Sequence, residues 1–195
     1  MKGAIVRRLQ RIQSMLCFEG WAPNTQFTAT NGLGRVALQA CILGAVWGLH
    51  FVMTLLIVLS QKNIIVLGSL NTFLGEARIR MLLQWCVYVL LMSTFHLLEF
   101  FTTAIYNPGV TTAESFLVNH SLMYTAALLS STTEFWLRFL CFPSSQSTTL
   151  TIVGLVVVLL AQTVRSLAMA TCGESFNHRI QTTKKDNHVL VTRGM

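Results

Sequence analysis

Long apolar stretches alternate with short polar ones along most of the chain, and four of these stretches predict membrane-spanning helices. At about 1.5 Å per residue, an apolar helix of about 20 residues matches the hydrocarbon core of a bilayer. The predicted spans lie near residues 36–60, 81–105, 123–140 and 149–171. The fold class that follows is all-α, a polytopic membrane helix bundle with about four transmembrane helices.

The connections between these stretches carry turn and interfacial signals. Residues 61–80 combine an apolar run too short to cross a bilayer with several charged residues, so we expect a loop that dips into the interface. Asn107-Pro108-Gly109 ends the second predicted span with a strong turn signal. Pro143 opens a tight connection, so the third and fourth spans should be antiparallel neighbours.

Both ends of the chain are polar and basic. We assign residues 1–35 to a cytosolic N-terminal arm, in which apolar and arginine positions fall on different faces of a helix, as in an interfacial anchor on anionic lipid. An arginine-rich, acid-poor start is also typical of a mitochondrial presequence, so both interpretations stay open. The bundle takes residues 36–171, and residues 172–195 form a cytosolic segment, since four spans place both basic ends on one side.

The composition agrees with a membrane protein. Hydrophobic residues make up 53% of the chain and charged residues 11%, a balance well outside soluble-domain averages. The net charge of +7 has its carriers mainly beside apolar stretches, with no aromatic residues interleaved, so we expect contact with membrane lipid and no nucleic acid. The five cysteines are scattered without paired spacing, so we predict neither a disulfide framework nor a metal site.

Ionisable residues within the predicted spans are candidates for function. His96 and Glu99 lie three residues apart on one face, which is costly in lipid unless that face points into the bundle. His-x-x-Glu can ligate a metal, but a bundle site needs matching carboxylates and the sequence has no second copy. We therefore favour an internal polar contact that fixes packing. Glu134 and Arg138 should neutralise each other at i,i+4, and Arg165 should extend to the interface.

Separate segments of the chain carry a resemblance to a known family. The sequence RSLAMATCGESFNHRIQTTKKDNHVLVTRG, which starts at Arg165, resembles the isoprenylcysteine carboxyl methyltransferase family. Upstream, FHLLEFFTTAIYNP and SFLVNHSLMYTAALLSSTTEF are similar to the front half of that family and occur in the right order. Members of the family are integral membrane enzymes that methylate the C-terminal prenylcysteine of CaaX proteins with S-adenosylmethionine.

The resemblance implies an activity, a cofactor and a compartment. The chain would be part of a protein-S-isoprenylcysteine O-methyltransferase of the endoplasmic reticulum membrane, using S-adenosyl-L-methionine on prenylated CaaX proteins that end in farnesyl- or geranylgeranyl-cysteine. Within the matching segment, Gln181 would bond the cofactor, and the cofactor cleft would be lined by His188, Val189, Leu190 and Val191. The acceptor carboxylate is already ionised at neutral pH, so transfer needs positioning and electrostatic stabilisation rather than a general base.

The family pattern continues past Met195, where this sequence ends. An RHPSY-like motif, an arginine for the substrate carboxylate and an acidic residue near the cofactor belong to that continuation, so the resemblance assigns no catalytic residue here. We expect a fragment, a truncated gene model or a short form that binds cofactor weakly and turns over little. The alternative is a non-catalytic four-span membrane protein, either a regulatory short form or an adaptor. A small transporter is disfavoured because no internal repeat is present.

Overall fold

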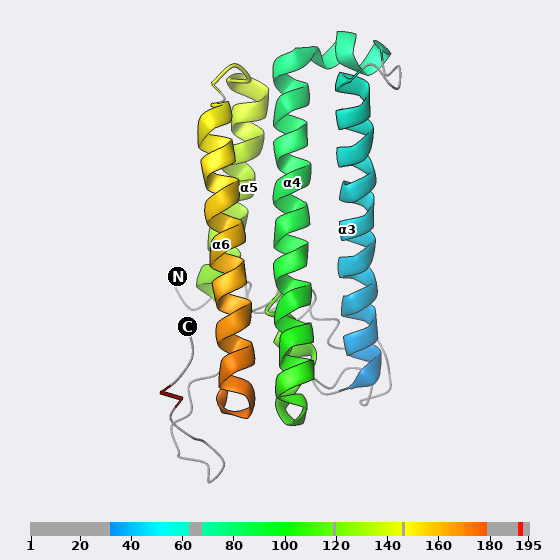
Figure 1. The fold of residues 1–195 in the computed structure, drawn as a ribbon. Coiled ribbons are helices and arrows are strands. Elements are labelled where there is room, and N and C mark those ends of the chain that lie inside the picture. Colours follow the sequence, from blue (N-terminus) through cyan, green and yellow to red (C-terminus); the bar gives the residue numbers. More distant parts are fainter. Residues whose placement is uncertain (1–31, 63–67, 119, 146, 179–190, 193–195) are drawn as a thin grey trace, which may run out of the picture.

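The computed structural model describes residues 32–62, 68–118, 120–145, 147–178 and 191–192, and helices fill most of these ranges (Figure 1). The long helices are α3 (Leu33–Gln61), α4 (Gly68–Tyr106), α5 (Leu122–Cys141) and α6 (Thr148–Cys172). Short 3₁₀ helices follow α4 and α6, namely η1 (Pro108–Val110), η2 (Ala113–Phe116) and η3 (Gly173–Ser175). The described residues contain no strand, so the predicted all-α helix bundle is confirmed.

Local chemistry explains where these helices begin and end. The Ser121 hydroxyl accepts a hydrogen bond from the backbone N–H of Tyr124 (3.1 Å) and caps the start of α5. Ser147 caps α6 in the same way. At the other end, α4 stops at Tyr106, shortly before Pro108, as the turn signal predicts.

Successive long helices run in opposite directions (Figure 1). The start of α3 therefore lies at the same end of the bundle as the end of α6, and we call this the α6-exit end. The same end holds η1, η2 and η3. The residues that leave α6 therefore meet the connection between α4 and α5.

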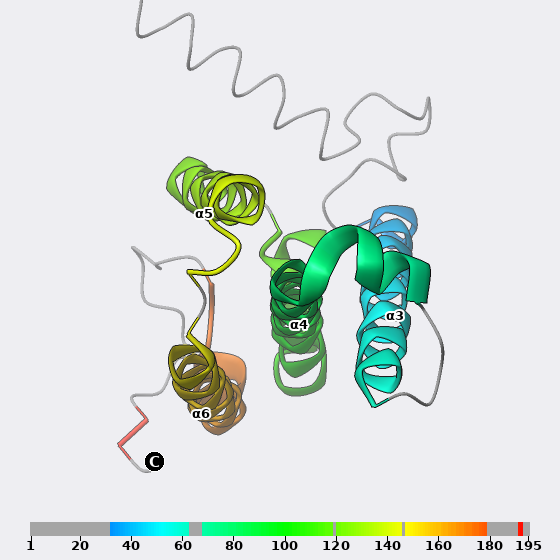
Figure 2. The same cartoon turned by 90° about the horizontal axis from the view of Figure 1, so that it is seen from above.

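The central helix of the bundle is α4, which lies between α3 on one side and α5 and α6 on the other (Figure 2). Ile57 of α3 forms an apolar cluster with Ile79 and Cys86 of α4. Trp47 also donates from its indole N–H to the Thr94 hydroxyl, at 3.0 Å. One face of α4 is thus fixed by α3, and its opposite face is available to α5 and α6.

Among the described residues, three helices are long and apolar enough to cross a bilayer, judged by length and composition: Leu33–Gln61, Thr72–Tyr106 and Thr148–Ser175. The predicted third span is also a helix, α5, but it is more polar. Residues 130–134 in its middle contribute four hydroxyl side chains and a glutamate. That glutamate forms the predicted i,i+4 ion pair with Arg138, at 3.7 Å, which partly offsets its charge.

The expectation of a loop over residues 61–80 is wrong for the residues from Gly68 onward, because α4 already begins there. The charges are accommodated on the helix surface, where Glu76 pairs with Arg80 at 3.6 Å. At Gly75 the helix breaks with φ 74° and ψ 157°, a conformation largely restricted to glycine. The first turns of α4 therefore lie across the end of the bundle between α3 and the rest of α4 (Figure 2). Residues 63–67 are outside the described ranges.

The predicted antiparallel order of α5 and α6 is confirmed, but they do not pack against each other (Figure 2). Each is linked to α4 instead. Gln84 of α4 donates to the Thr151 hydroxyl of α6 at 2.8 Å, while the Tyr88 hydroxyl lies 3.3 Å from that of Ser131 in α5. A short connection fixes the direction of two helices, whereas these separate contacts with α4 set the distance between them.

Candidate functional site

A row of polar residues at the α6-exit end forms the centre of the candidate site. Glu99 and Thr103 lie on α4 and Asn107 directly follows it, so the spacing of four residues places all three on one side. All three are buried. We call them the polar row. Because buried polar groups in a membrane helix are costly without partners, their contacts indicate what the site is built to hold.

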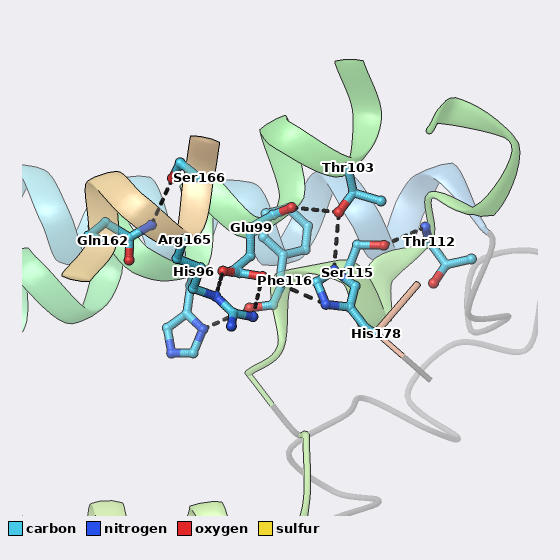
Figure 3. Close-up of polar contacts among 10 residues, drawn as sticks. All are labelled: His96, Glu99, Thr103, Thr112, Ser115, Phe116, Gln162, Arg165, Ser166 and His178. Atoms are coloured by element: carbon cyan, nitrogen blue, oxygen red, sulfur yellow. Dashed lines mark hydrogen bonds and ion pairs between the residues drawn. The ribbon is translucent and has the colours of Figure 1, made fainter. Parts of the chain in front are cut away.

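Glu99 forms a two-pronged ion pair with Arg165 of α6 (Figure 3). Arg165 Nη2 lies 3.0 Å from Glu99 Oε2, and Nε donates to Oε1. The Glu99 side chain is fully buried, whereas that of Arg165 is 43% exposed and lies over the Phe95 ring. The expectation that Arg165 extends to the interface did not include this partner, although a buried carboxylate needs a cation beside it.

Thr103 contacts His178, which lies beyond the end of α6 (Figure 3). The Thr103 hydroxyl donates to the Glu99 backbone carbonyl at 2.8 Å, so it must accept from His178, whose Nε2 is 3.1 Å away. A neutral His178 then carries its proton on Nε2, and its Nδ1, 3.7 Å from Glu99 Oε2, bears a lone pair. The neutral imidazole therefore donates to Thr103 only, and Nδ1 can pair with the Glu99 carboxylate only when it is protonated.

Asn107 holds the backbone directly after α6. Its side-chain amide donates to the carbonyl of Glu174 at 3.0 Å and to that of Phe176 at 2.9 Å. The sequence suggested only a turn at Asn107, since Asn-Pro is a local turn signal. The four-residue spacing of the polar row is visible in the sequence. The partners of Asn107 are backbone carbonyls, which are present in every residue and so cannot be identified from the sequence.

The His96 side chain does not contact Glu99 directly, although an internal polar contact is confirmed for each of them. His96 Nδ1 lies 2.7 Å from the Phe116 carbonyl, which can only accept, so Nδ1 carries the proton. Nε2 then accepts from the Tyr124 hydroxyl, at 3.2 Å. His96 therefore joins α4 to α5 through Tyr124, and to η2 through Phe116 (Figure 3).

A cavity of about 460 Å³ opens beside these contacts. Its wall combines aromatic and aliphatic side chains with a guanidinium and two imidazoles: Phe95, Leu117, His120, Tyr124, Arg165, Phe176, Asn177 and His178. Such a wall suits a ligand that is apolar along most of its length and anionic or polar at one end. Among the described residues, no group of three or more His, Cys, Asp or Glu could hold a metal ion.

The residues expected to bind a cofactor lie mostly outside the described ranges. Gln181 and residues 188–190 lie outside the described ranges, whereas Val191 is described and is 40% exposed. The described chain reaches His178, which lines the cavity, three residues before Gln181. The segment that would carry the cofactor contacts therefore starts at the cavity wall.

The segment after α6 and α6 itself match a family model. Residues 152–195 match the isoprenylcysteine carboxyl methyltransferase (ICMT) family. The chain is 39% identical over 162 residues to protein-S-isoprenylcysteine O-methyltransferase of Rattus norvegicus, covering 83% of this chain and 49% of that protein. It is 45% identical over 109 residues to the protein of the same name from Xenopus laevis, covering 55% of this chain and 38% of that one.

A solved structure described as the eukaryotic intramembrane Ras methyltransferase ICMT shares this fold, with a TM-score of 0.58 and 26% identity over 78% of this chain and 71% of that chain. The chain is thus similar to the isoprenylcysteine carboxyl methyltransferase family in its family model, in named relatives and in fold. The resemblance predicted from the sequence segments is confirmed, and the chain is a multi-pass membrane protein. It spans about half the length of the rat relative.

The free energy of unfolding of this chain should fall as the pH drops through the range in which histidine titrates. Burial lowers the pKa of His178, and Arg165 and His120 add to this effect while Glu99 opposes it. As the pH falls below about 6.5, the unfolded chain binds a proton that the folded chain does not yet bind. The stability that His178 contributes is therefore present above that pH and decreases below it. The decrease ends when the folded protein also binds the proton.

Chemical unfolding in detergent between about pH 7.5 and 5.5 tests this expectation. The His178→Gln variant keeps a donor for Thr103 but has no titrating ring, so its unfolding free energy should vary less with pH. An unchanged pH dependence in this variant would assign the effect to other groups.

Proposed function

We propose that the chain forms the bilayer-embedded part of an S-adenosyl-L-methionine-dependent methyltransferase of the endoplasmic reticulum membrane. Its acceptor would be the C-terminal prenylcysteine carboxylate of CaaX proteins. One observation carries the proposal. The cavity at the α6-exit end is lined by residues of the apolar helices α4 and α6, and also by residues of the segment after α6 that matches the family. The names of the relatives, which are O-methyltransferases acting on protein-S-isoprenylcysteine, agree with it.

The walls of the cavity suit a lipid-modified acceptor. A farnesyl or geranylgeranyl chain is hydrocarbon and remains favourably in the bilayer or against Phe95, Leu117 and Phe176, while the carboxylate needs polar surroundings. An acceptor of this kind must lie at the boundary between apolar and polar surroundings. The cavity of about 460 Å³ at the α6-exit end has both apolar and polar residues in its wall.

The chemistry asks little of the side chains beyond positioning. A C-terminal carboxylate is ionised at neutral pH and is itself the nucleophile, so no general base is required. Its transfer rate depends on alignment with the methyl donor and on exclusion of water. Arg165 is already paired with Glu99, so we assign it to the structure of the site rather than to the substrate.

The methyl donor would be held by the segment after His178. Gln181 would donate or accept a hydrogen bond, and His188, Val189, Leu190 and Val191 would line the cleft, partly through backbone groups. These groups fit a ligand with a purine, a ribose and a zwitterionic amino acid, which needs several neutral hydrogen-bond partners. Bound S-adenosyl-L-methionine would supply the methyl group.

Transfer of labelled methyl groups tests the proposal. The chain, and the chain extended with the C-terminal part of the rat relative, would be reconstituted in nanodiscs with a farnesylcysteine analogue. We expect the extended protein to methylate the analogue, and the Gln181→Ala and His188→Ala variants to lose on the order of tenfold or more in affinity for the donor. An extended protein that neither binds S-adenosylhomocysteine nor transfers methyl groups would refute the proposal.

A further inference from the structure

The polar row contacts the chain at successive points along its exit from α6. Glu99 forms an ion pair with Arg165, which lies within α6. Asn107 donates to two backbone carbonyls directly after α6, and the Thr103 hydroxyl lies within hydrogen-bond distance of His178. The first of these contacts joins two helices, whereas the other two hold residues that lie beyond the end of α6.

The backbone changes direction within the segment whose carbonyls accept hydrogen bonds from Asn107. Gly173, directly after α6, has φ 50° and ψ −128°, a backbone conformation that residues other than glycine rarely adopt. By Phe176 the backbone is extended, with φ −77° and ψ 132°. Fixing two carbonyls that are two residues apart sets both the position and the direction of the backbone between them, which a single hydrogen bond would not do.

We propose that Asn107 and Thr103 are positioning residues for the methyl-donor-binding segment. This inference rests on the proposed function and adds to it the element that places the segment. The two residues fix the chain as far as His178, and Gln181 follows only three residues later. They would act on the donor-binding groups through the backbone that precedes them, and not by contact with the donor or the substrate.

The burial of these contacts makes them effective. Asn107 is 8% exposed, Thr103 is 3% exposed and the His178 side chain is 13% exposed. Water can replace a lost hydrogen bond poorly at such positions, so removal of one partner leaves the other unsatisfied. Positioning groups of this kind affect methyl transfer strongly, because small displacements of reacting groups lower the rate by large factors.

Two substitutions in the full chain test the proposal in nanodiscs. Asn107→Asp is nearly isosteric but turns a carboxylate oxygen toward two carbonyl oxygens, and Thr103→Val removes the acceptor for His178. Hydrogen–deuterium exchange over residues 173–192 reports whether the segment stays docked. Isothermal titration with S-adenosylhomocysteine reports donor binding. We expect faster exchange in both variants, with affinity reduced on the order of tenfold in Thr103→Val and up to about a hundredfold in Asn107→Asp.

Two further variants separate positioning from general stability. Thr103→Ser keeps the hydroxyl and should restore both exchange and affinity to the wild-type values. Thr133→Val removes a hydroxyl that makes the same type of bond to its own helix, from Thr133 to the Leu129 carbonyl at 2.8 Å, on an exposed face of α5. This control should leave both measurements unchanged.

The possible outcomes distinguish this inference from the proposed function. Unchanged exchange in Asn107→Asp and Thr103→Val would overturn the inference, as would faster exchange with unchanged affinity, and in both cases the proposed function would stand. A failure of Thr103→Ser to restore affinity would also overturn it. Wild-type protein that binds no S-adenosylhomocysteine, alone or with the C-terminal part of the rat relative, would refute the proposed function and this role of the polar row together.

Discussion

Replacing Arg165 with methionine should lower the free energy of unfolding by about 3–5 kcal/mol, because Glu99 would remain buried without its cation. Glu99 is fully buried in the folded protein, and His178 Nδ1 is 3.7 Å away, farther than the guanidinium. Neither α4 nor α6 can expose the carboxylate to water without separating from the other. The loss should appear in unfolding of detergent-solubilised protein.

The opposite substitution should be milder. In Glu99→Gln the Arg165 side chain, which is already 43% exposed, can turn toward water or the interface, so the penalty for an unpaired charge is smaller. The double variant Arg165→Met with Glu99→Gln should recover most of the stability lost in Arg165→Met alone. This non-additivity is the signature of a buried pair, and strictly additive effects would contradict the assignment.

The chain contains a matched control for this comparison. Glu134 and Arg138 also form an ion pair, at 3.7 Å, but their side chains are 71% and 43% exposed. Removing either partner should cost only about 0–1 kcal/mol, because an exposed pair gains little over its hydrated groups. Equal losses at both pairs would show that burial of Glu99 does not determine the effect.

The helices were predictable because the bilayer sets their length. The predicted spans near residues 36–60, 81–105, 123–140 and 149–171 correspond to α3, the main part of α4, α5 and α6. Counting apolar residues could not find the start of α4, because the charged residues 76–80 and the break at Gly75 separate it from the long apolar part of the helix. The charges do not end the helix, since they lie on its surface, where Glu76 and Arg80 pair.

The site was only partly predictable, since its contacts join residues far apart in the sequence. Position alone suggested that Arg165 extends to the nearby interface, but its partner Glu99 is on another helix. The ionisable residues His96 and Glu99 are recognisable in the sequence because charges in a span are rare. The sequence indicates only a turn at Asn107, because its partners are backbone carbonyls, which every residue possesses.

The cofactor residues have no physical signature in the sequence. Gln181, His188, Val189, Leu190 and Val191 were assigned by resemblance, and their binding role stays a prediction. Neither periodicity nor charge distinguishes them from ordinary polar surface. The structure adds the mechanical context instead, because the segment they belong to is fixed at its beginning by the polar row.

Among the residues that connect α4 and α5, Phe116 should contribute most to the free energy of unfolding. Its side chain is fully buried, and its ring stacks on that of Phe100 with centroids 4.1 Å apart and an interplanar angle of 5°. Its carbonyl accepts the hydrogen bond from His96. The next residue, Leu117, has a left-handed backbone with φ 55°, which is unfavourable for leucine and persists only where packing holds it.

The Phe116→Ala variant should therefore lose about 3–5 kcal/mol of unfolding free energy, since a buried ring is replaced by a cavity. Phe101→Ala is the control: this ring lies on the same helix as Phe100 but is 53% exposed, so its removal should cost far less. Thermal unfolding of both variants in the same detergent makes the comparison. A loss in Phe116→Ala no larger than in Phe101→Ala would mean that the α4–α5 connection is held by the hydrogen bonds of His96 and not by the buried ring.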